Sequence, residues 1–216
     1  MCWNQYVSLN TFVFSVFVLL LIVYNNKYSP YKIEELNSVY AYFFLMSFIT
    51  MQLIEFFLWR NLNDKEINKL FSNLGALLLL LQPVASLMLL KDIPLRNKML
   101  TIYGIPAFSY FIYQVTIKDF VTVVSKTGHL KWEWIDLSGN KRILFIGWLF
   151  FLFFSIFYNK NYLGLAYTVA LLLISLYSYT KDGSFGSLWC WSINSFMLFY
   201  AIKLLIIFPY KEHGLC

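Results

Sequence analysis

Charged residues are scarce in this chain of 216 residues. Asp, Glu, Lys and Arg make up 13% of it, whereas soluble domains usually carry roughly 25%. Hydrophobic residues make up 60%, aromatic residues 21%, and the mean hydropathy is +0.63. Such a composition cannot cover a water-exposed surface, so it predicts an integral membrane protein and leaves the particular membrane open.

Histidine and cysteine are also rare. The two histidines, His129 and His213, lie outside the apolar runs, and no cysteine pair has a metal-ligand spacing such as C-x-x-C. We therefore predict neither a metal nor another cofactor. Cys2 and Cys190 fall on the same side of the predicted topology, which leaves a disulfide between them open.

The sequence also lacks the usual signals of several other classes of protein. No serine nucleophile accompanies a histidine base and no apolar run carries paired aspartates, so we do not expect an enzyme. The net charge of +6 is spread through the loops, which suits contact with lipid phosphates and excludes a nucleic-acid face. The first apolar run has neither a basic segment nor a cleavage site before it, so a retained helix is expected.

The most prominent feature of the sequence is a series of long apolar runs. Each is long enough to cross much or all of a hydrocarbon core of about 30 Å as a helix, and Tyr and Trp crowd their ends. The prediction is an all-α, single-domain bundle of seven transmembrane helices, at about 7–24, 39–59, 70–90, 99–115, 143–158, 163–179 and 188–208. Nine basic residues fall on one side and seven on the other, which does not decide the orientation.

One connection, 116–142, is long. Its segment DFVTVVSKTGHLKWEWIDL alternates apolar and polar residues on both sides of a turn at Gly128, which predicts a β-hairpin. Trp132 and Trp134 would share one face of it and lie on the lipid headgroups or over the mouth of the bundle. An irregular interfacial loop is the alternative.

The second apolar run contains one carboxylate, Glu55. Gln52, Glu55 and Trp59 stand at i, i+3 and i+7 and so share a helix face. A carboxylate within a membrane span is energetically costly and indicates a functional site. Polar side chains gather in the half of the bundle on the side of the N-terminus. The candidate ligands for a solute or ion are Glu55, Gln52, Asn10, Asn73 and Asn194, and the candidate pocket-lining residues are Trp189, Trp191, Gln114 and Gln82.

Three functions fit this pattern. The first is binding or conduction of a small solute, a cation or protons through a polar pocket around Glu55. The second is a structural or interaction protein of a membrane, in which these groups only bond helices together. Either protein could form a homo-oligomer. The third is a retinal protein with its Schiff base on Lys203, although no carboxylate lies at the depth of Lys203. Glu55 lies about 15 Å from Lys203 along the membrane normal, which argues against a salt bridge.

Short motifs also suggest two resemblances. The run ends IVYNNKY and IFYNKNY are alike, as in the 3+1+3 repeat of small sugar transporters, but the proline–glutamine signatures of those transporters are absent and chance is the alternative. The set MCWN, SLNTF, QLIEFFLW, QP and GSLWCWSIN resembles small uncharacterised heptahelical membrane proteins of large DNA viruses and some microbes. That resemblance implies a seven-helix fold and no particular activity.

Overall fold

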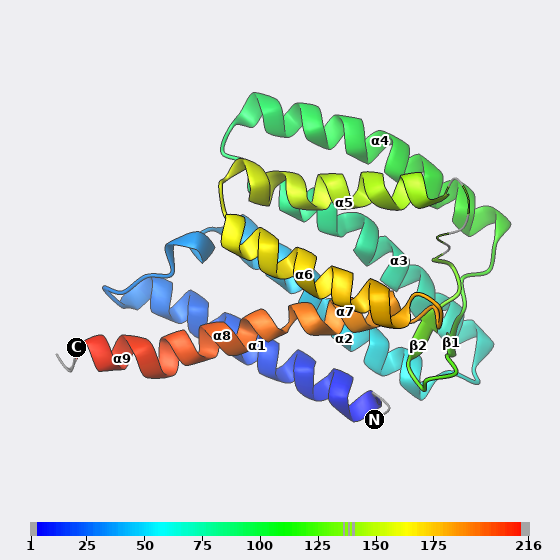
Figure 1. Ribbon diagram of the computed structural model, residues 1–216, viewed down its shortest axis with the longest axis horizontal. Coiled ribbons are helices and arrows are strands. Elements are labelled where there is room, and N and C mark those ends of the chain that lie inside the picture. Colours follow the sequence, from blue (N-terminus) through cyan, green and yellow to red (C-terminus); the bar gives the residue numbers. More distant parts are fainter. Residues whose placement is uncertain (1–3, 136, 138, 140, 213–216) are drawn as a thin grey trace.

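The computed structural model describes residues 4–135, 137, 139 and 141–212 (Figure 1). These residues contain seven helical stretches that are long and apolar enough to cross a membrane, which confirms the predicted number. The first six are α1 (Gln5–Tyr28), α2 (Val39–Arg60), α3 (Lys65–Leu87), α4 (Ile93–Ile117), α5 (Lys141–Tyr158) and α6 (Tyr162–Tyr179). The seventh combines α7 (Phe185–Ile193), α8 (Ser195–Ile202), the π-helical turn η2 (Lys203–Ile207) and α9 (Phe208–Glu212).

Helix α2 lies at the centre of the bundle. It packs against α1, α3 and α7, while α3 also contacts α4 and α5, and α6 joins α5 to α7. The start of α1, the α2–α3 turn, the α6–α7 turn and the β-hairpin lie at one end, which we call the hairpin end (Figure 1). A short 3₁₀ helix, η1 (Glu34–Leu36), and the α3–α4 and α5–α6 turns lie at the opposite end.

Several helices extend beyond the predicted apolar runs because polar residues cap them. Helix α4 begins at Ile93 and not near 99, since the Asp92 carboxylate accepts a hydrogen bond from the Leu95 amide (3.0 Å) and Pro94 fits the first turn. Helix α3 begins at Lys65 for the same reason, with the Ile67 amide donating to Asp64 (3.1 Å). Because charged side chains cap them, these helices begin earlier than the boundaries predicted from hydropathy alone.

The seventh stretch runs from Phe185 to Tyr210 as one apolar span, as predicted, but its hydrogen bonding changes along its length. Helix α7 ends at Ile193 with Asn194 as its C-cap; the Asn194 amide donates to the Trp191 carbonyl (3.0 Å), and α8 starts at Ser195. Farther on, the π-helical turn η2 widens the helix and ends at Ile207, two residues before Pro209, which has no amide proton to donate. Because these changes of helix geometry depend on single residues, the hydropathy of the run does not predict them.

The hairpin prediction is confirmed, and the irregular-loop alternative is wrong. Strand β1 (Thr122–Val124) pairs antiparallel with β2 (Leu130–Trp132), so that Thr122 faces Trp132, and Gly128 has the positive φ (81°) that the turn requires. The Trp132 indole does not lie on a headgroup surface. It is 3% exposed and packs against Met51 of α2 and Cys190 of α7.

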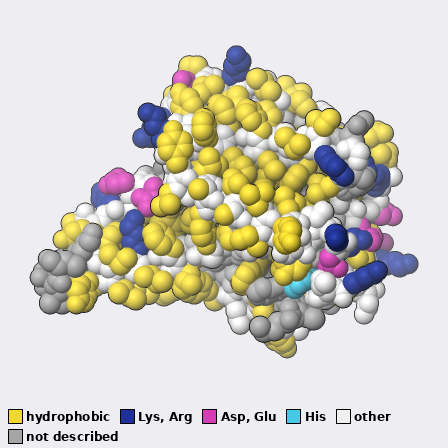
Figure 2. Space-filling view, in the orientation of Figure 1, with side chains coloured by type: hydrophobic (Ala, Val, Ile, Leu, Met, Phe, Trp, Pro, Cys, Tyr) yellow, Lys and Arg dark blue, Asp and Glu magenta, His cyan; other side chains and the backbone are white. Residues whose placement is uncertain are grey.

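The outer surface of the bundle is largely apolar. Figure 2 shows hydrophobic side chains over the middle of the molecule and charged side chains toward its ends. Large apolar side chains such as Leu163 (85% exposed) and Tyr177 (93% exposed) project outward. This arrangement is the one expected of a bundle whose sides face lipid tails and whose ends face water.

Candidate functional site

Glu55 and Gln52 lie in the interior, on the face of α2 that meets α7. Their side chains are 3% and 0% exposed, and the Gln52 carboxamide nitrogen donates to Glu55 Oε2 (3.2 Å). Ser187 of α7 lies next to the Glu55 carboxyl group. The contact between Gln52 and Glu55 follows from their spacing of three residues, as the sequence predicted.

Cys190 of α7 and Gln82 of α3 extend this group of polar side chains. The Cys190 thiol is free and fully buried, and it lies beside both Gln82 and Glu55. Gln82 is 0% exposed. We call Gln52, Glu55, Gln82 and Cys190 the Glu55 cluster.

The hydrogen-bonding capacity of the Glu55 cluster is mostly unused. Gln52 Oε1, Glu55 Oε1 and both polar atoms of the Gln82 carboxamide are buried without a hydrogen-bond partner among the described residues. Buried polar groups are nearly always bonded, because an unmade bond costs about 1–3 kcal/mol. The cluster can therefore accept a proton, water or a small cation between α2, α3 and α7.

Helix α3 supplies a polar face to this region. Asn68, Ser72, Gln82 and Ser86 are spaced at 4, 10 and 4 residues, which keeps them close to one face, and all four are buried. Ser86 at the opposite end bonds the Ser155 hydroxyl (2.6 Å) and the Leu152 carbonyl (2.5 Å) of α5. Of these four, only Gln82 makes no hydrogen bond with another described residue.

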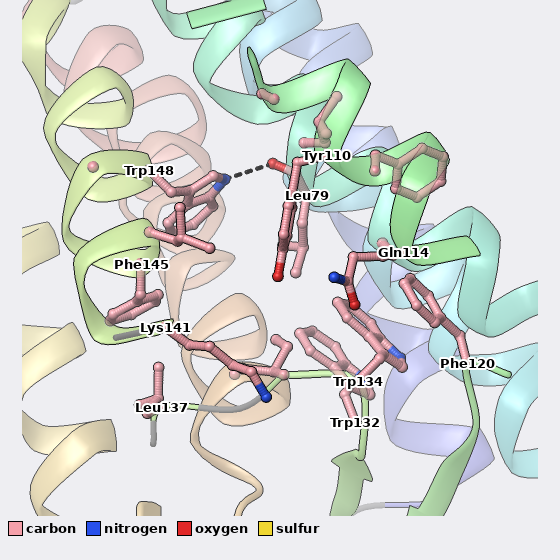
Figure 3. A pocket seen from close by; sticks show the side chains of 18 of the residues that line it. Leu79, Tyr110, Gln114, Phe120, Trp132, Trp134, Leu137, Lys141, Phe145 and Trp148 are labelled. Carbon is pink, nitrogen blue, oxygen red and sulfur yellow. Dashed lines mark hydrogen bonds between the residues drawn. The ribbon is translucent and has the colours of Figure 1, made fainter. Parts of the chain in front are cut away.

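A cavity of about 620 Å³ adjoins the Glu55 cluster. It lies between α3, α4, α5, α7 and the hairpin, and Cys190 forms part of its wall. Figure 3 shows Tyr110 and Gln114 of α4 on one side, Phe145 and Trp148 of α5 on the other, and Lys141 extending across the hairpin end. The Trp148 indole donates to the Leu79 carbonyl (2.8 Å).

Three more indoles line this cavity. Trp132, Trp134 and Trp189 belong to its wall, and the Nε1 atom of each is buried without a hydrogen-bond partner in the part of the chain that the structure describes. Trp132 and Trp134 stack on each other with ring centroids 5.3 Å apart, and Phe120 stacks on Trp134 at 5.7 Å. The wall is therefore aromatic, and the unpartnered N–H groups of its indoles are enclosed by protein.

The hairpin is fixed to the bundle by polar contacts on two sides. The Asn68 carboxamide of α3 donates to the Thr122 carbonyl (2.9 Å) and accepts from the Thr122 amide (3.0 Å), as a neighbouring strand would. On the other side, the hydroxyls of Thr127 and Ser184 donate to the Asp182 carboxylate (2.5 and 2.8 Å). These bonds hold the stacked indoles inside the bundle.

Two titratable groups at the hairpin end have shifted pKa values. Partial desolvation alone would raise the pKa of Asp182, but hydrogen bonds from Ser125, Thr127 and Ser184 lower it to about 2. Desolvation lowers the pKa of His129, and the nearby Asp182 carboxylate partly opposes that effect. His129 packs edge-on against the Tyr179 ring (5.3 Å).

The sequence-predicted residues are partly brought together. Gln52 bonds Glu55, and Gln82 lies at Cys190 without lining the cavity, whereas Trp189 and Gln114 do line it. Asn10, by contrast, is exposed on α1 and does not belong to the cluster, because the rotation of α1 turns it outward. Asn73 is half-buried, and its Oδ1 has no partner among the described residues, but it does not line the cavity.

Asn194 and Trp191 bond α7 to α1. Asn194 accepts from the Ser15 hydroxyl (3.1 Å) and donates to the Cys190 carbonyl (2.9 Å), and the Trp191 indole donates to the Thr11 hydroxyl (3.1 Å). Neither residue lines the cavity. Their contacts are those of interhelical hydrogen bonds.

Lys203 lies toward the opposite end from Glu55, as the sequence predicted. Its ammonium group bonds the Glu35 carboxylate (3.0 Å) and lies near the rings of Tyr200 and Phe208. This pairing favours an interfacial anchor over a Schiff base for Lys203. The question of a disulfide to Cys190 involves Cys2, which lies outside the described residues.

Sequence reasoning missed the inward position of the paired indoles and the placement of Cys190 between Gln82 and the charge of Glu55. The alternation KWEW predicted that Trp132 and Trp134 share a face, but it does not say which face meets protein. Within the described residues, no group of three or more His, Cys, Asp or Glu side chains could hold a metal ion. Comparisons with protein-family models, with curated proteins and with solved structures find no match to this chain.

Proposed function

We propose that this chain is a multi-pass membrane protein that binds a proton or a small cation at Glu55 and passes it along the interface of α2, α3 and α7. The observation that carries the proposal is the Glu55 cluster, with its buried carboxyl group and unpartnered amide atoms. A carboxyl group at this depth is costly and is rarely retained in a span without a function. The Gln52 oxygen is a suitable neutral ligand beside it, and the Gln82 oxygen offers another farther along, at Cys190.

Other buried polar groups provide an internal comparison. Asn194 and Ser86 use their hydrogen-bonding groups on neighbouring helices, so the bonding of helices to one another accounts for them. Gln82 and Glu55 Oε1 make no such bond within the described chain. A purely structural role, which is the second candidate function, is therefore favoured for Asn194 and disfavoured for Glu55.

The polar groups also suggest a direction of passage. Ser187 and Glu55 lie toward the hairpin end, and Cys190 and Gln82 follow them into the bundle. Ser86 lies one turn beyond Gln82 on the same face of α3, at its bond to Ser155 of α5. Water molecules between these groups would complete a proton path.

Flux into liposomes that contain the purified full chain tests this proposal. A pH-sensitive dye reports protons, and a sodium-sensitive dye reports Na⁺. We expect Glu55→Gln to lower the flux about tenfold or more, because the amide can neither release a proton nor neutralise a cation. The matched control is Glu35→Gln, which removes an exposed carboxylate at the opposite end and should leave the flux within about twofold.

Circular dichroism of all three proteins establishes that they are folded. Flux that is the same in wild type and Glu55→Gln would contradict the proposal. Absence of both proton and Na⁺ flux in a folded wild type would contradict it as well and would favour the structural role. A proton flux without a Na⁺ flux would support the proposal and identify the proton as the species carried.

A further inference from the structure

The cavity beside the Glu55 cluster opens sideways between α4 and α5. Ile102 of α4 and Ile143 of α5 both line it, and they are 49% and 68% exposed. Away from the hairpin end, Tyr103 and Phe151 close the gap between the two helices, with ring centroids 5.1 Å apart. A molecule dissolved in the bilayer could thus enter without crossing water.

The cavity is long and has two chemically different ends. Its lining on α4 runs from Ile102 to Lys118, or about 24 Å at 1.5 Å per residue, which covers one leaflet and its interface. Aromatic and aliphatic side chains line the inner part, whereas Gln114, Lys118 and Lys141 lie at the hairpin end. The volume of about 620 Å³ lies within the range of about 300–1,000 Å³ that is usual for small-molecule sites.

Among the described residues, the charged side chains that line the hairpin end of the cavity are Lys118, Lys141, Asp119 and Glu133. Asp119 is paired with Lys69 (2.5 Å) and Glu133 with Lys131 (3.7 Å). Lys118 makes no ion pair with another described residue. An anionic group would therefore find a cation there, next to the donor of the Gln114 carboxamide.

We propose that this cavity binds a single-chain anionic amphiphile that enters from the bilayer between α4 and α5. The chain would lie along Tyr103, Trp148 and Trp189, and the carboxylate or phosphate would contact Lys118. The proposal rests on the membrane location proposed above, but it does not depend on Glu55. It assigns a ligand to a site that proton or cation passage does not use.

Quenching of tryptophan fluorescence by brominated palmitate tests the proposal on the full chain in detergent. Trp132, Trp134, Trp148 and Trp189 line the cavity, so a bound chain lies beside four of the seven tryptophans. Gly147 also lines it, and a Cβ atom added there would meet no atom within 4 Å. We therefore expect Gly147→Leu to fill the cavity without disturbing the fold and to weaken binding about tenfold or more.

Gly104→Leu is the matched control. Gly104 lies on α4 with equally open space at its Cβ, but it does not line the cavity, so this variant should bind palmitate as wild type does. Lys118→Gln should weaken binding about threefold to tenfold through loss of the cation. Glu55→Gln should leave binding unchanged, which separates this test from the flux measurement.

Brominated lysophosphatidate and brominated monoacylglycerol complete the experiment. Saturable quenching by palmitate or by lysophosphatidate supports the proposal, and the tighter of the two identifies the headgroup as carboxylate or phosphate. Equal quenching in Gly147→Leu and wild type would overturn it, because the amphiphile would then lie only in the surrounding detergent. Equal affinity for the neutral monoacylglycerol would overturn it too, since the cation would then play no part.

Discussion

Two glycines make room for the paired indoles of the hairpin. The Trp132 ring lies against Gly186 of α7, and the Trp134 ring lies near Gly75 of α3. Because a Cβ atom on Gly186 would stand only 2.9 Å from Trp132 Cζ3, any larger residue there forces the indole to move. The packing of the hairpin into the bundle thus depends on a missing side chain.

We predict that Gly186→Ala lowers the free energy of unfolding by about 1–3 kcal/mol, the usual effect of overpacking in a close-packed core. Trp132 is too enclosed by Trp134, Met51 and Cys190 to move without strain. Thermal unfolding in detergent, followed by tryptophan fluorescence, measures the change.

Gly147→Ala provides the comparison for Gly186→Ala. It also places a methyl group on a helical glycine, but in open space, so we expect it to leave stability unchanged or to raise it by up to about 1 kcal/mol through helix propensity. If both variants unfold at the same temperature, the close contact between Gly186 and Trp132 has no energetic consequence.

The spacing of residues predicts contacts within one helix and not contacts between helices. Gln52 and Glu55 meet because they stand at i and i+3 on α2, and this spacing can be read directly from the sequence. Gln82 meets Cys190 because of how α3 and α7 are rotated against each other, and Asn10 faces outward because of the rotation of α1. Rotation depends on the packing of whole faces, which one sequence does not reveal.

At the scale of the element, the hairpin is the part that connects the helices at its end of the bundle. Alternation and Gly128 predicted its strands and its turn, because both are local properties. Its insertion could not be predicted, because either face of the alternating segment could meet protein. Asn68 on α3 and Asp182 between α6 and α7 fix which face does so.

Acid should loosen the hairpin through Asp182. The pKa of this carboxyl group is lowered from its ordinary value of 3.8 to about 2 in the folded protein. A lowered pKa means that the folded state favours the carboxylate, so its stabilisation is fully present above about pH 4 and is lost as the pH falls through about 2. We expect Asp182→Asn to lower stability by about 1 kcal/mol at neutral pH, since the group is partly screened by solvent.

Melting temperatures of wild type and Asp182→Asn between pH 7 and pH 2 measure this effect. The difference between the two proteins should be constant down to about pH 4 and should shrink below it. A difference that is the same at pH 2 and pH 7 would show that the charge of Asp182 does not hold the hairpin. Asp92→Asn is a suitable control, because Asp92 caps α4 at the opposite end.

At the scale of the whole molecule, the hairpin and the α3–α4 turn lie at opposite ends of a bundle of seven helices that are long and apolar enough to cross a membrane. Helix α4 is the least apolar of the seven, and few of its residues are buried against the rest of the molecule. Whether α4 crosses therefore decides both the topology and the existence of the lateral opening beside it.

We predict that single cysteines at Lys126 and Lys181 react with a membrane-impermeant maleimide from one side of sealed vesicles, and that cysteines at Lys32 and Lys91 react from the other. All four positions are exposed and lie outside the apolar helices. In the background chain Cys2 and Cys216 are replaced by Ser, while Cys190 stays because its thiol is buried.

Labelling at Lys91 and Lys126 decides whether α4 crosses the membrane, because only α4 and the strand β1 lie between these two residues in the sequence. Reaction of both from the same side would mean that α4 lies along the membrane surface. The cavity between α4 and α5 would then open to water, and an amphiphile could not reach it from the bilayer. Reaction from opposite sides would establish that α4 spans the membrane. The side from which Lys126 is labelled would also give the orientation of the bundle, which the distribution of nine basic residues on one side and seven on the other leaves undecided.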